Sequence, residues 1–264
     1  MNRFRAKKLM QVVPVLFLLL CSRSWAATDY IDINNPFIRK VPVAVPFFKA
    51  EPDGQKGSRF SREWSQLLAD TLKFTGFFKI LDPAGFLEDP QKAGIAPPYI
   101  QFKNWTAVGA ELLITGGLTF GDDIVEMELR LFDTFKARLI VGKRYRGLVK
   151  DQRRIIRRFC NEVIFALTGK KGIFTSKIGF VSTGSGNKEI YTCDFDGFNP
   201  KQITRNKSIT MSPAWSSDGK WFAYTSYVRG RPDLFIRNIK GKRGTVVSNE
   251  GLNITPAWVP GETN

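Results

Sequence analysis

The sequence contains no histidine among its 264 residues. This absence excludes every Ser-His and Cys-His nucleophile pair and removes the commonest metal ligand of proteins. The stretch Ser182-Thr183-Gly184-Ser185-Gly186 resembles a nucleophile elbow only superficially, because Phe180 replaces the first glycine and a strand pattern follows. The sequence therefore predicts no catalytic residue, no cofactor site and a protein that is not an enzyme.

A metal site is also not predicted. Asp194-x-Asp196-Gly197 begins like a calcium-binding loop, but Arg205 stands where that loop needs a bidentate glutamate. We interpret Asp196-Gly197 as the corner of a β-hairpin, and Asp218-Gly219 in the same way, because glycine supplies the positive φ of such turns.

Cysteine is scarce, with three residues in the whole chain. Cys21 falls in the amino-terminal leader, Cys160 on the apolar face of a predicted helix and Cys193 in a strand pattern. Partners in different elements need closely matched geometry to form a disulfide, so two separate buried thiols are expected. An exported chain without a disulfide framework favours a bacterial envelope.

Long apolar runs are absent as well. The longest at the amino terminus, Val12–Leu20, has nine residues, whereas a spanning helix needs about 20. Residues 1–27 have the basic start, the apolar run and the Ser24-Trp25-Ala26 site of a secretory signal peptide. A membrane anchor and a lipid attached to Cys21 are the alternatives, and Leu20 argues against the second. We expect a mature chain with no membrane span.

The net charge of +16 is spread along the chain. A protein that binds phosphate backbones usually concentrates its charge, and the only dense basic cluster is Arg153, Arg154, Arg157 and Arg158. These arginines alternate in pairs with apolar residues, as on an amphipathic helix. We interpret them as the solvated face of that helix, with a nucleic-acid patch as the alternative, and predict no nucleic-acid partner.

Residues 28–170 predict an α+β domain. Helical periodicity covers Ser58–Phe74 and Asp151–Thr168, and residues 82–100 are rich in proline and glycine and predict a loop. Strand patterns cover 41–46, 77–81, 111–119, 124–133 and 138–145, and the two prolines of the first place it near a sheet edge. The expected fold is a mixed sheet packed with helices.

Residues 173–264 contain an internal repeat. Ser212-Pro213-Ala214-Trp215 recurs as Thr255-Pro256-Ala257-Trp258, and Phe180-Val181-Ser182-Thr183 recurs as Ala223-Tyr224-Thr225-Ser226, both after 43 residues. This period of short strands with Asp-Gly turns is the size of one propeller blade. The segment predicts about two blades of an incomplete β-propeller, with Trp215 and Trp258 packed between blades.

Together these segments resemble the TolB family of soluble periplasmic proteins of the Tol-Pal cell-envelope system. The blade motif Ser-Pro-Ala-Trp-Ser-x-Asp-Gly-Lys at 212–220 is shared with many propellers, but its pairing with this α+β domain is specific. The other matching segments are 36–40, 43–46, 109–117, 129–133, 187–191 and 194–197.

The resemblance implies a non-catalytic periplasmic protein that supports outer-membrane integrity and cell division. It implies an amino-terminal domain with an anticodon-binding-like fold and a six-bladed propeller. It also implies that the propeller binds the peptidoglycan-associated lipoprotein Pal and that the start of the mature chain binds the inner-membrane protein TolA. The residues that carry this TolA-binding role by resemblance are Thr28, Asp29, Tyr30, Ile31, Asp32, Ile33 and Asn34.

The chain departs from the family pattern after Trp258, where Val259-Pro260-Gly261-Glu262 replaces the expected Ser-Pro-Asp-Gly. Counted in periods of 43 residues, about four blades of a six-bladed ring are missing. A frameshift, a premature stop and a deliberate truncation each fit this pattern.

Two other functions remain open at this point. The chain could be the amino-terminal fragment of a propeller-containing serine peptidase, although such peptidases do not usually carry this α+β domain. The anticodon-binding likeness and the arginine helix could also indicate RNA binding, against which the export signal argues.

Overall fold

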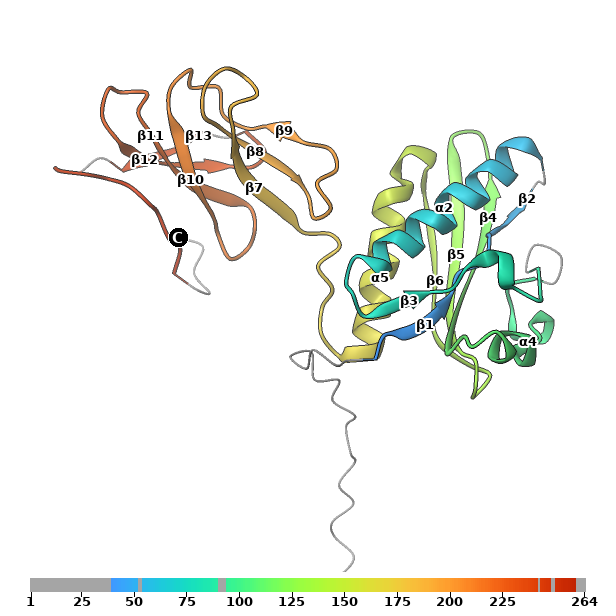
Figure 1. Ribbon diagram of the computed structural model, residues 1–264. Helices are drawn as coiled ribbons and strands as arrows, with labels where there is room; N and C mark the ends of the chain where they lie inside the picture. The colour runs from blue at the N-terminus through green and yellow to red at the C-terminus, as the bar shows by residue number, and fades with distance from the viewer. Residues whose placement is uncertain (1–38, 52–53, 90–93, 242, 248–249, 260–264) are drawn as a thin grey trace, which may run out of the picture. The chain divides into compact units, whose positions relative to one another are not determined.

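The computed structural model describes residues 39–51, 54–89, 94–241, 243–247 and 250–259 (Figure 1). The predicted signal peptide and the predicted TolA-binding residues Thr28–Asn34 lie outside these ranges. Within the ranges, every helix is too short or too polar to cross a membrane.

A six-stranded mixed sheet forms the first part of the described chain. Its order is β3-β1-β4-β5-β6, with β2 alongside β4. Strands β1, β2, β3 and β4 pair in parallel, and β4, β5 and β6 pair antiparallel as consecutive hairpins. The bounds are β1 Val41–Ala44, β2 Lys49–Glu51, β3 Phe78–Ile80, β4 Leu112–Phe120, β5 Ile124–Asp133 and β6 Arg138–Leu148. The predicted mixed sheet is confirmed, and β1 lies one strand in from the edge.

Two long helices cover one face of this sheet. Helix α2 spans Gln55–Lys73 and α5 spans Gln152–Thr168. Their buried residues, among them Leu68 and Phe159, form one hydrophobic core with the inward-facing residues of β4 and β5. Helix α5 ends at Gly169, whose φ of 70° is the left-handed conformation that glycine adopts without strain.

The opposite face carries a smaller core around Trp105, which is 1% exposed. Trp105 belongs to α4, Phe102–Ala107, and its indole Nε1 donates to a carboxylate oxygen of Glu88 at 2.7 Å. The predicted loop 82–100 contains two short 3-10 turns, η1 Pro83–Gly85 and η2 Pro97–Tyr99. Sequence periodicity did not predict α4 or β2, because six and three residues are too few to establish a period.

The repeat region folds into two antiparallel sheets. The first contains β7 Lys177–Ser182, β8 Glu189–Asp194 and β9 Lys201–Gln202. The second contains β10 Thr210–Trp215, β11 Trp221–Ser226, β12 Asp233–Asn238 and β13 Arg243–Val247. Their blade-like strand arrangement confirms the predicted propeller fold class.

Side chains of the two sheets pack together. Ile190 of the first sheet shares a core with Phe222 and Tyr224 of the second. Trp215 packs on Phe222 with ring centroids 5.8 Å apart, and Trp258 Nε1 donates to the Ala214 carbonyl at 2.9 Å. Trp215 therefore packs between the two sheets as predicted, and the packing of Trp258 between blades stays a prediction.

The hairpin corners also form as predicted. Gly197 and Gly219 adopt positive φ values of 80° and 67°. The backbone at each corner is closed by a hydrogen bond, from Gly197 N–H to the Asp194 carbonyl and from Gly219 N–H to the Ser216 carbonyl, both at 2.9 Å. A side chain at either glycine would have to adopt a conformation that L-residues rarely occupy.

The main hydrophobic core continues beyond residue 170. Phe174 is 0% exposed and belongs to the core that α2 and α5 build. Its ring meets that of Phe195 edge-on at 5.3 Å, and Phe195 meets Phe74 of the α2 end at the same distance. The division of the chain into 28–170 and 173–264 stays a prediction, and the position of Phe174 bears on where a stable fragment would end.

We predict that a fragment of residues 28–176 unfolds cooperatively and melts above a fragment of residues 28–170. Burying a phenylalanine side chain contributes about 1.5–3 kcal/mol, which corresponds to roughly 5 °C for a domain of this size. Thermal unfolding followed by circular dichroism would measure the difference. The control is Phe174→Ala in the longer fragment, which should melt like the shorter one; equal melting of all three would contradict the role of Phe174.

Candidate functional site

The arginine-rich side of α5 is the most highly charged feature of the described chain. Arg154 has an exposed side chain, as an amphipathic helix predicts, whereas the Arg157 side chain is 9% exposed. The prediction of a fully solvated face is therefore wrong for Arg157. A buried guanidinium is stable only when it is paired and hydrogen-bonded, so its partners explain why it is there.

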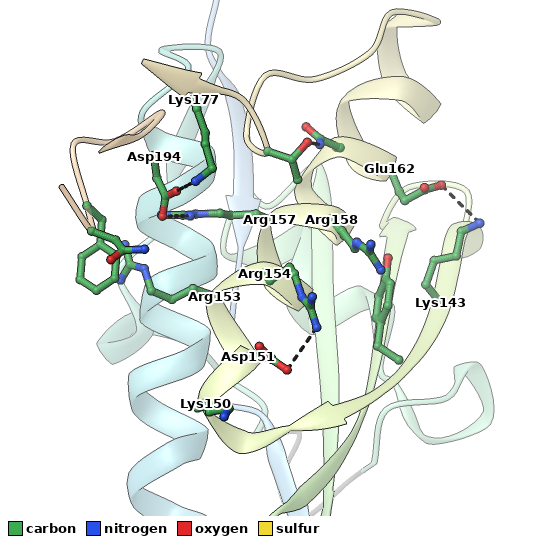
Figure 2. A pocket seen from close by; sticks show the side chains of 15 residues that line it. Lys143, Lys150, Asp151, Arg153, Arg154, Arg157, Arg158, Glu162, Lys177 and Asp194 are labelled. Atoms are coloured by element: carbon green, nitrogen blue, oxygen red, sulfur yellow. Dashed lines mark hydrogen bonds and ion pairs between the residues drawn. The ribbon is translucent and has the colours of Figure 1, made fainter. Parts of the chain in front are cut away.

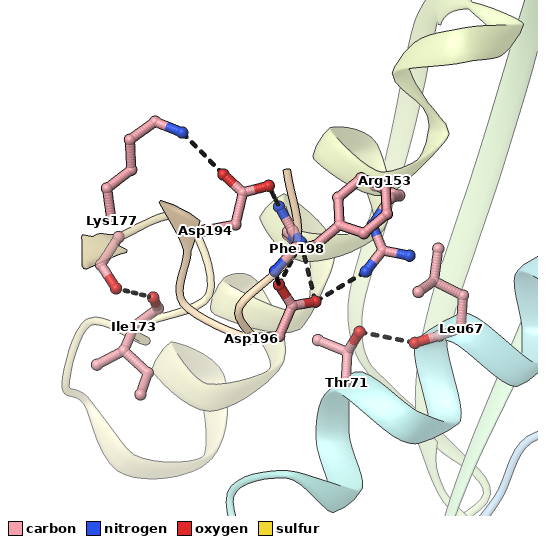
Figure 3. A network of polar contacts seen from close by, with 10 residues as sticks. Leu67, Thr71, Arg153, Ile173, Lys177, Asp194, Asp196 and Phe198 are labelled. Atoms are coloured by element: carbon pink, nitrogen blue, oxygen red, sulfur yellow. Dashed lines mark hydrogen bonds and ion pairs between the residues drawn. The ribbon is translucent and has the colours of Figure 1, made fainter. Parts of the chain in front are cut away.

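Arg157 binds two carboxylates, that of Asp194 at the end of β8 and that of Asp196 in the turn that follows. Its Nη1 donates to Asp194 Oδ2 at 2.6 Å, and its Nη2 donates to Asp196 Oδ1 at 2.8 Å. Lys177 Nζ donates to the second oxygen of Asp194 at 2.7 Å, and Arg153 Nη2 donates to Asp196 Oδ2 at 2.8 Å (Figure 3). Three cations thus share two carboxylates, and the network joins α5 to the sheet of β7 and β8.

Both carboxylates of this network remain ionised well below neutral pH. Burial alone would raise the pKa of Asp194, but hydrogen bonds from Arg157 and Lys177 outweigh it, so the pKa lies below its ordinary value. The pKa of Asp196 is lowered for the same reason, with hydrogen bonds from Arg157 and from the Phe198 N–H opposing burial. The network therefore remains a set of ion pairs at neutral pH.

Phe198 covers one side of the network. The guanidinium carbon of Arg153 lies 3.9 Å from the centroid of the Phe198 ring, within the range of a cation–π contact. The ring itself is 51% exposed. The turn after β8 therefore holds α5 through an aromatic ring as well as through Asp196.

A cleft of about 790 Å³ opens beside the network (Figure 2). Its walls come from α5, from β6, from the residues leading into β7 and from the turn at 198–199. The charged residues that line it are Lys143, Lys150, Asp151, Arg153, Arg154, Arg157, Arg158, Glu162, Lys177 and Asp194. Cations outnumber carboxylates on its walls, so the cleft attracts anions.

Most of these cations are already paired. Arg154 Nη2 lies 3.1 Å from Asp151 Oδ2, and Lys143 Nζ lies 3.3 Å from Glu162 Oε2. Arg158 and Lys150 form no ion pair with any residue that the structure describes. With so few unpaired cations, the arrangement favours a structural role for the arginine helix over a track for a phosphate backbone.

The cleft offers charged and hydrogen-bonding side chains that can bind a ligand. Tyr145 lines it, and burial, with the nearby charge of Glu162, raises the pKa of its hydroxyl to about 12 despite the opposing charge of Arg158. The hydroxyl therefore stays protonated and can donate or accept a hydrogen bond. No cluster of metal-ligating side chains occurs in the described ranges.

The two cysteines of the described chain, Cys160 and Cys193, are buried and free, which confirms the prediction of two separate thiols. Burial raises the pKa of the Cys160 thiol. Reactive cysteines need an accessible thiolate, so Cys160 acts as a small apolar residue of the core.

Sequence reasoning placed the candidate site elsewhere. The predicted partner-binding residues Thr28, Asp29, Tyr30, Ile31, Asp32, Ile33 and Asn34 lie outside the described residues, so the structure brings none of them together. The network around Arg157 was not predicted. Two features of the sequence could have revealed it. One is a pair of arginines that recurs four residues later on a helix, and the other is two aspartates that lie two residues apart in a strand and its turn.

We predict that Arg157→Met destabilises the chain by about 3 kcal/mol, because it leaves the buried Asp194 and the partly buried Asp196 with one cation each while keeping the aliphatic contacts of the side chain. Arg154→Met removes an exposed ion pair from the same helix and should cost less than about 0.5 kcal/mol. Urea unfolding of both variants would measure this. Equal effects of the two substitutions would show that the buried network contributes no more to the free energy of unfolding than an exposed ion pair does.

The same variant should show a characteristic pH dependence. The pKa values of Asp194 and Asp196 are lower in the folded chain than their ordinary value of about 3.9, so their stabilisation is complete above that value and is lost as the pH falls through the folded pKa values. The difference in melting temperature between the wild type and Arg157→Met should therefore shrink below about pH 4. A difference that stays constant from pH 6 to pH 2.5 would contradict the ion-pair origin.

Comparison with known proteins places these features in a family. The family described as "TolB amino-terminal domain" matches residues 29–140, and the family described as "TolB beta propeller domain" matches residues 165–264. The chain is 54% identical over 250 residues to the Tol-Pal system protein TolB of Desulfosudis oleivorans, covering 94% of this chain and 57% of that protein. It is 32% identical to a TolB homolog of Chlorobaculum tepidum, covering 94% of this chain and 55% of that protein.

A solved structure agrees on the fold. The crystal structure of TolB from Acinetobacter baumannii superimposes with a TM-score of 0.64 at 23% identity, covering 79% of this chain and 50% of that one. The peptidase alternative has no support in these comparisons. The chain spans little more than half the length of the two curated relatives named above. Because both its α+β domain and its propeller sheets match, it belongs to the TolB family.

Proposed function

We propose that this chain is a non-catalytic component of the Tol-Pal envelope system that acts in the periplasm by binding other proteins. The observation that carries the proposal is the 54% identity over 250 residues to a Tol-Pal system protein TolB, with both characteristic domains matched in one chain. The signal-like residues 1–27 supply the route to the periplasm.

The chemistry of the described chain supports binding as the activity. The arginines that look functional in the sequence are largely used to hold α5 against β8, and Tyr145 is a protonated hydroxyl rather than a base. The sequence supplies no histidine to act as a general base near neutral pH. What the chain presents instead is sheet surface and exposed apolar side chains, which are the materials of protein recognition.

The amino-terminal segment Thr28–Asn34 is the proposed binding site for TolA. Its side chains mix two aspartates with Tyr30, Ile31 and Ile33 without strict alternation, so it need not belong to a buried strand. Such a segment can add as an edge strand to a partner sheet, where main-chain hydrogen bonds give affinity and the three large side chains give specificity.

The lipoprotein Pal is the second proposed partner, and the propeller sheets are its proposed binding surface. This chain contains two of these sheets in its described part, with exposed apolar residues such as Phe198 and Ile209. Binding to Pal would use the turns of these sheets, because turns carry the side chains that a rigid scaffold displays.

We predict that deleting residues 28–34 abolishes binding to the carboxyl-terminal domain of TolA and leaves the melting temperature nearly unchanged. A triple substitution, Tyr30→Ala with Ile31→Ala and Ile33→Ala, removes the side chains and keeps the main chain, and should weaken binding strongly if side chains give specificity. Isothermal titration calorimetry with TolA of the same organism would measure both.

The matched control is Thr28→Ala with Asn34→Ala, which alters the ends of the segment and should leave binding within a few-fold of the wild type. Undiminished affinity in the deletion would refute the assignment of the segment. A large fall in melting temperature on deletion would show that the segment is part of the fold rather than a binding element.

A further inference from the structure

A second cleft, separate from the one beside α5, lies in the propeller region. Its volume of about 490 Å³ is within the usual range of ligand-binding pockets. One wall is the outer part of the second sheet, from β11 to β13, and the other is the segment 203–206 that leads from β9 towards β10. Because Tyr224 and Phe235 line the cleft and also belong to the core that the two sheets share, the cleft borders that core.

The charged residues that line this cleft all have the same sign. They are Arg205, Arg229 and Arg237, and no carboxylate is among the lining residues in the described ranges. In contrast to Arg157, none of the three forms an ion pair with a residue that the structure describes. A guanidinium offers five N–H donors in a planar fork, which matches the two oxygens of a carboxylate. These donors are therefore available to an anionic ligand.

The carboxylate that acts on this region from inside the fold has its own hydrogen-bond donors. Burial raises the pKa of the Tyr224 hydroxyl, and of the two charges that act on it, Glu189 raises the pKa and Arg237 lowers it. Glu189 is 2% exposed, and its carboxylate accepts hydrogen bonds from the Thr204 hydroxyl at 2.6 Å and from the Lys207 N–H at 2.8 Å. It forms no ion pair with a cation of the described chain, so it leaves the arginines of the cleft to a ligand.

The floor of the cleft is apolar and uncharged. The rings of Tyr224 and Phe235 stack with centroids 5.5 Å apart and an interplanar angle of 15°, and Ile203 and Val246 also line the cleft. Because the pKa of Tyr224 is raised, its hydroxyl stays protonated at neutral pH. A ligand that matches both the floor and the rim carries an apolar group together with negative charges.

The arginines are spread along the cleft. Arg237 pairs with Phe222, which lies four residues before the end of β11 at Ser226. Arg229 lies beyond that end in the turn after β11, so its backbone is about 13 Å or more from that of Arg237. In an extended peptide, side chains i and i+4 point to one face about 13 Å apart, with side chain i+2 between them. This spacing fits carboxylates at both ends of a five-residue stretch and an apolar side chain at its centre.

We propose that this cleft binds an extended acidic segment of another protein, with the pattern acid–x–apolar–x–acid. One carboxylate pairs with Arg229 and the other with Arg237, while Arg205 adds positive charge from the opposite wall. The central apolar side chain rests on Phe235. A single phosphate group would need the arginines to converge on one point, so their spread favours a peptide. Such binding extends the proposed function, protein binding in the periplasm, and needs neither TolA nor Pal to be tested.

Fluorescence anisotropy with labelled synthetic peptides and the full chain tests this site. The probe is a peptide of sequence Asp-Thr-Val-Thr-Asp with both ends blocked, and the matched control has asparagine in place of both aspartates. The acidic probe should bind at least about ten-fold more tightly than the control at low salt, and added salt should weaken it because exposed charges are screened. A third peptide, Thr-Asp-Val-Asp-Thr, brings its carboxylates about 7 Å apart and should bind several-fold more weakly than the probe.

Substitutions in the chain locate the binding. Arg229→Gln and Arg237→Gln should each weaken binding of the acidic probe by about ten-fold, because each removes one charge-assisted pair. Lys220→Gln is the matched control, since it removes one positive charge from a 73% exposed side chain of the same sheet outside the cleft. It should leave the affinity within about two-fold of the wild type, because exposed charges at a distance are screened.

Three results would overturn the proposal: equal affinity of the aspartate and asparagine peptides, equal affinity of the two aspartate spacings, or equal effects of Lys220→Gln and Arg237→Gln. Binding of tripolyphosphate without binding of the acidic probe would also overturn it, in favour of a phosphate ligand. Melting temperatures of the variants show whether a loss of affinity reports on folding. Arg229 is exposed and lies in a turn, so its variant decides the outcome if Arg237→Gln unfolds.

Discussion

The constraint on which this structure depends is the burial of the Arg157 guanidinium. Removing a charge of this size from water costs several kcal/mol, and the cost is offset only when carboxylates and hydrogen bonds surround it in a fixed geometry. Asp194 and Asp196 provide that geometry because a turn after β8 places both carboxylates toward α5. Each aspartate has a further cation, from Lys177 or Arg153, so each carboxylate is held by two cations and Arg157 is the member that joins the two halves of the network. The contact between α5 and the first propeller sheet is therefore specific in a way that aromatic packing by Phe174 and Phe195 alone would not be.

The same ion pairs decide what the basic helix can bind. A run of arginines attracts a phosphate backbone when the cations are spaced along a surface and free of protein partners. Here the carboxylates of β8, of its turn and of Asp151 take up three of the four arginines, and the charge left in the cleft is small. The arginines of α5 are thus largely paired within the fold, which fits a family whose members are named for an envelope system rather than for nucleic acid.

Much of this fold could be predicted from the sequence, and the errors have physical causes. Helix α5 and strands β5 and β8 have strong periodicity, and the repeat at 43 residues identified the propeller because two four-residue blocks recur at one spacing. The burial of Arg157 could not be predicted, because helical periodicity places a residue on a face but says nothing of a partner 37 residues away. Strand β2 was missed because three residues carry no pattern, and it forms only because β4 offers an edge at Gly117. The proposed TolA-binding segment remains a prediction from resemblance and composition.

The first propeller sheet is stabilised differently on its two sides, and this asymmetry connects the site with the repeat. On one side, the end of β8 and its turn meet α5, and ion pairs from Asp194 and Asp196 to Arg157 fix them there. In the part of the chain that the structure describes, the Trp215 indole N–H has no hydrogen-bond partner, although the sheet is docked on α5.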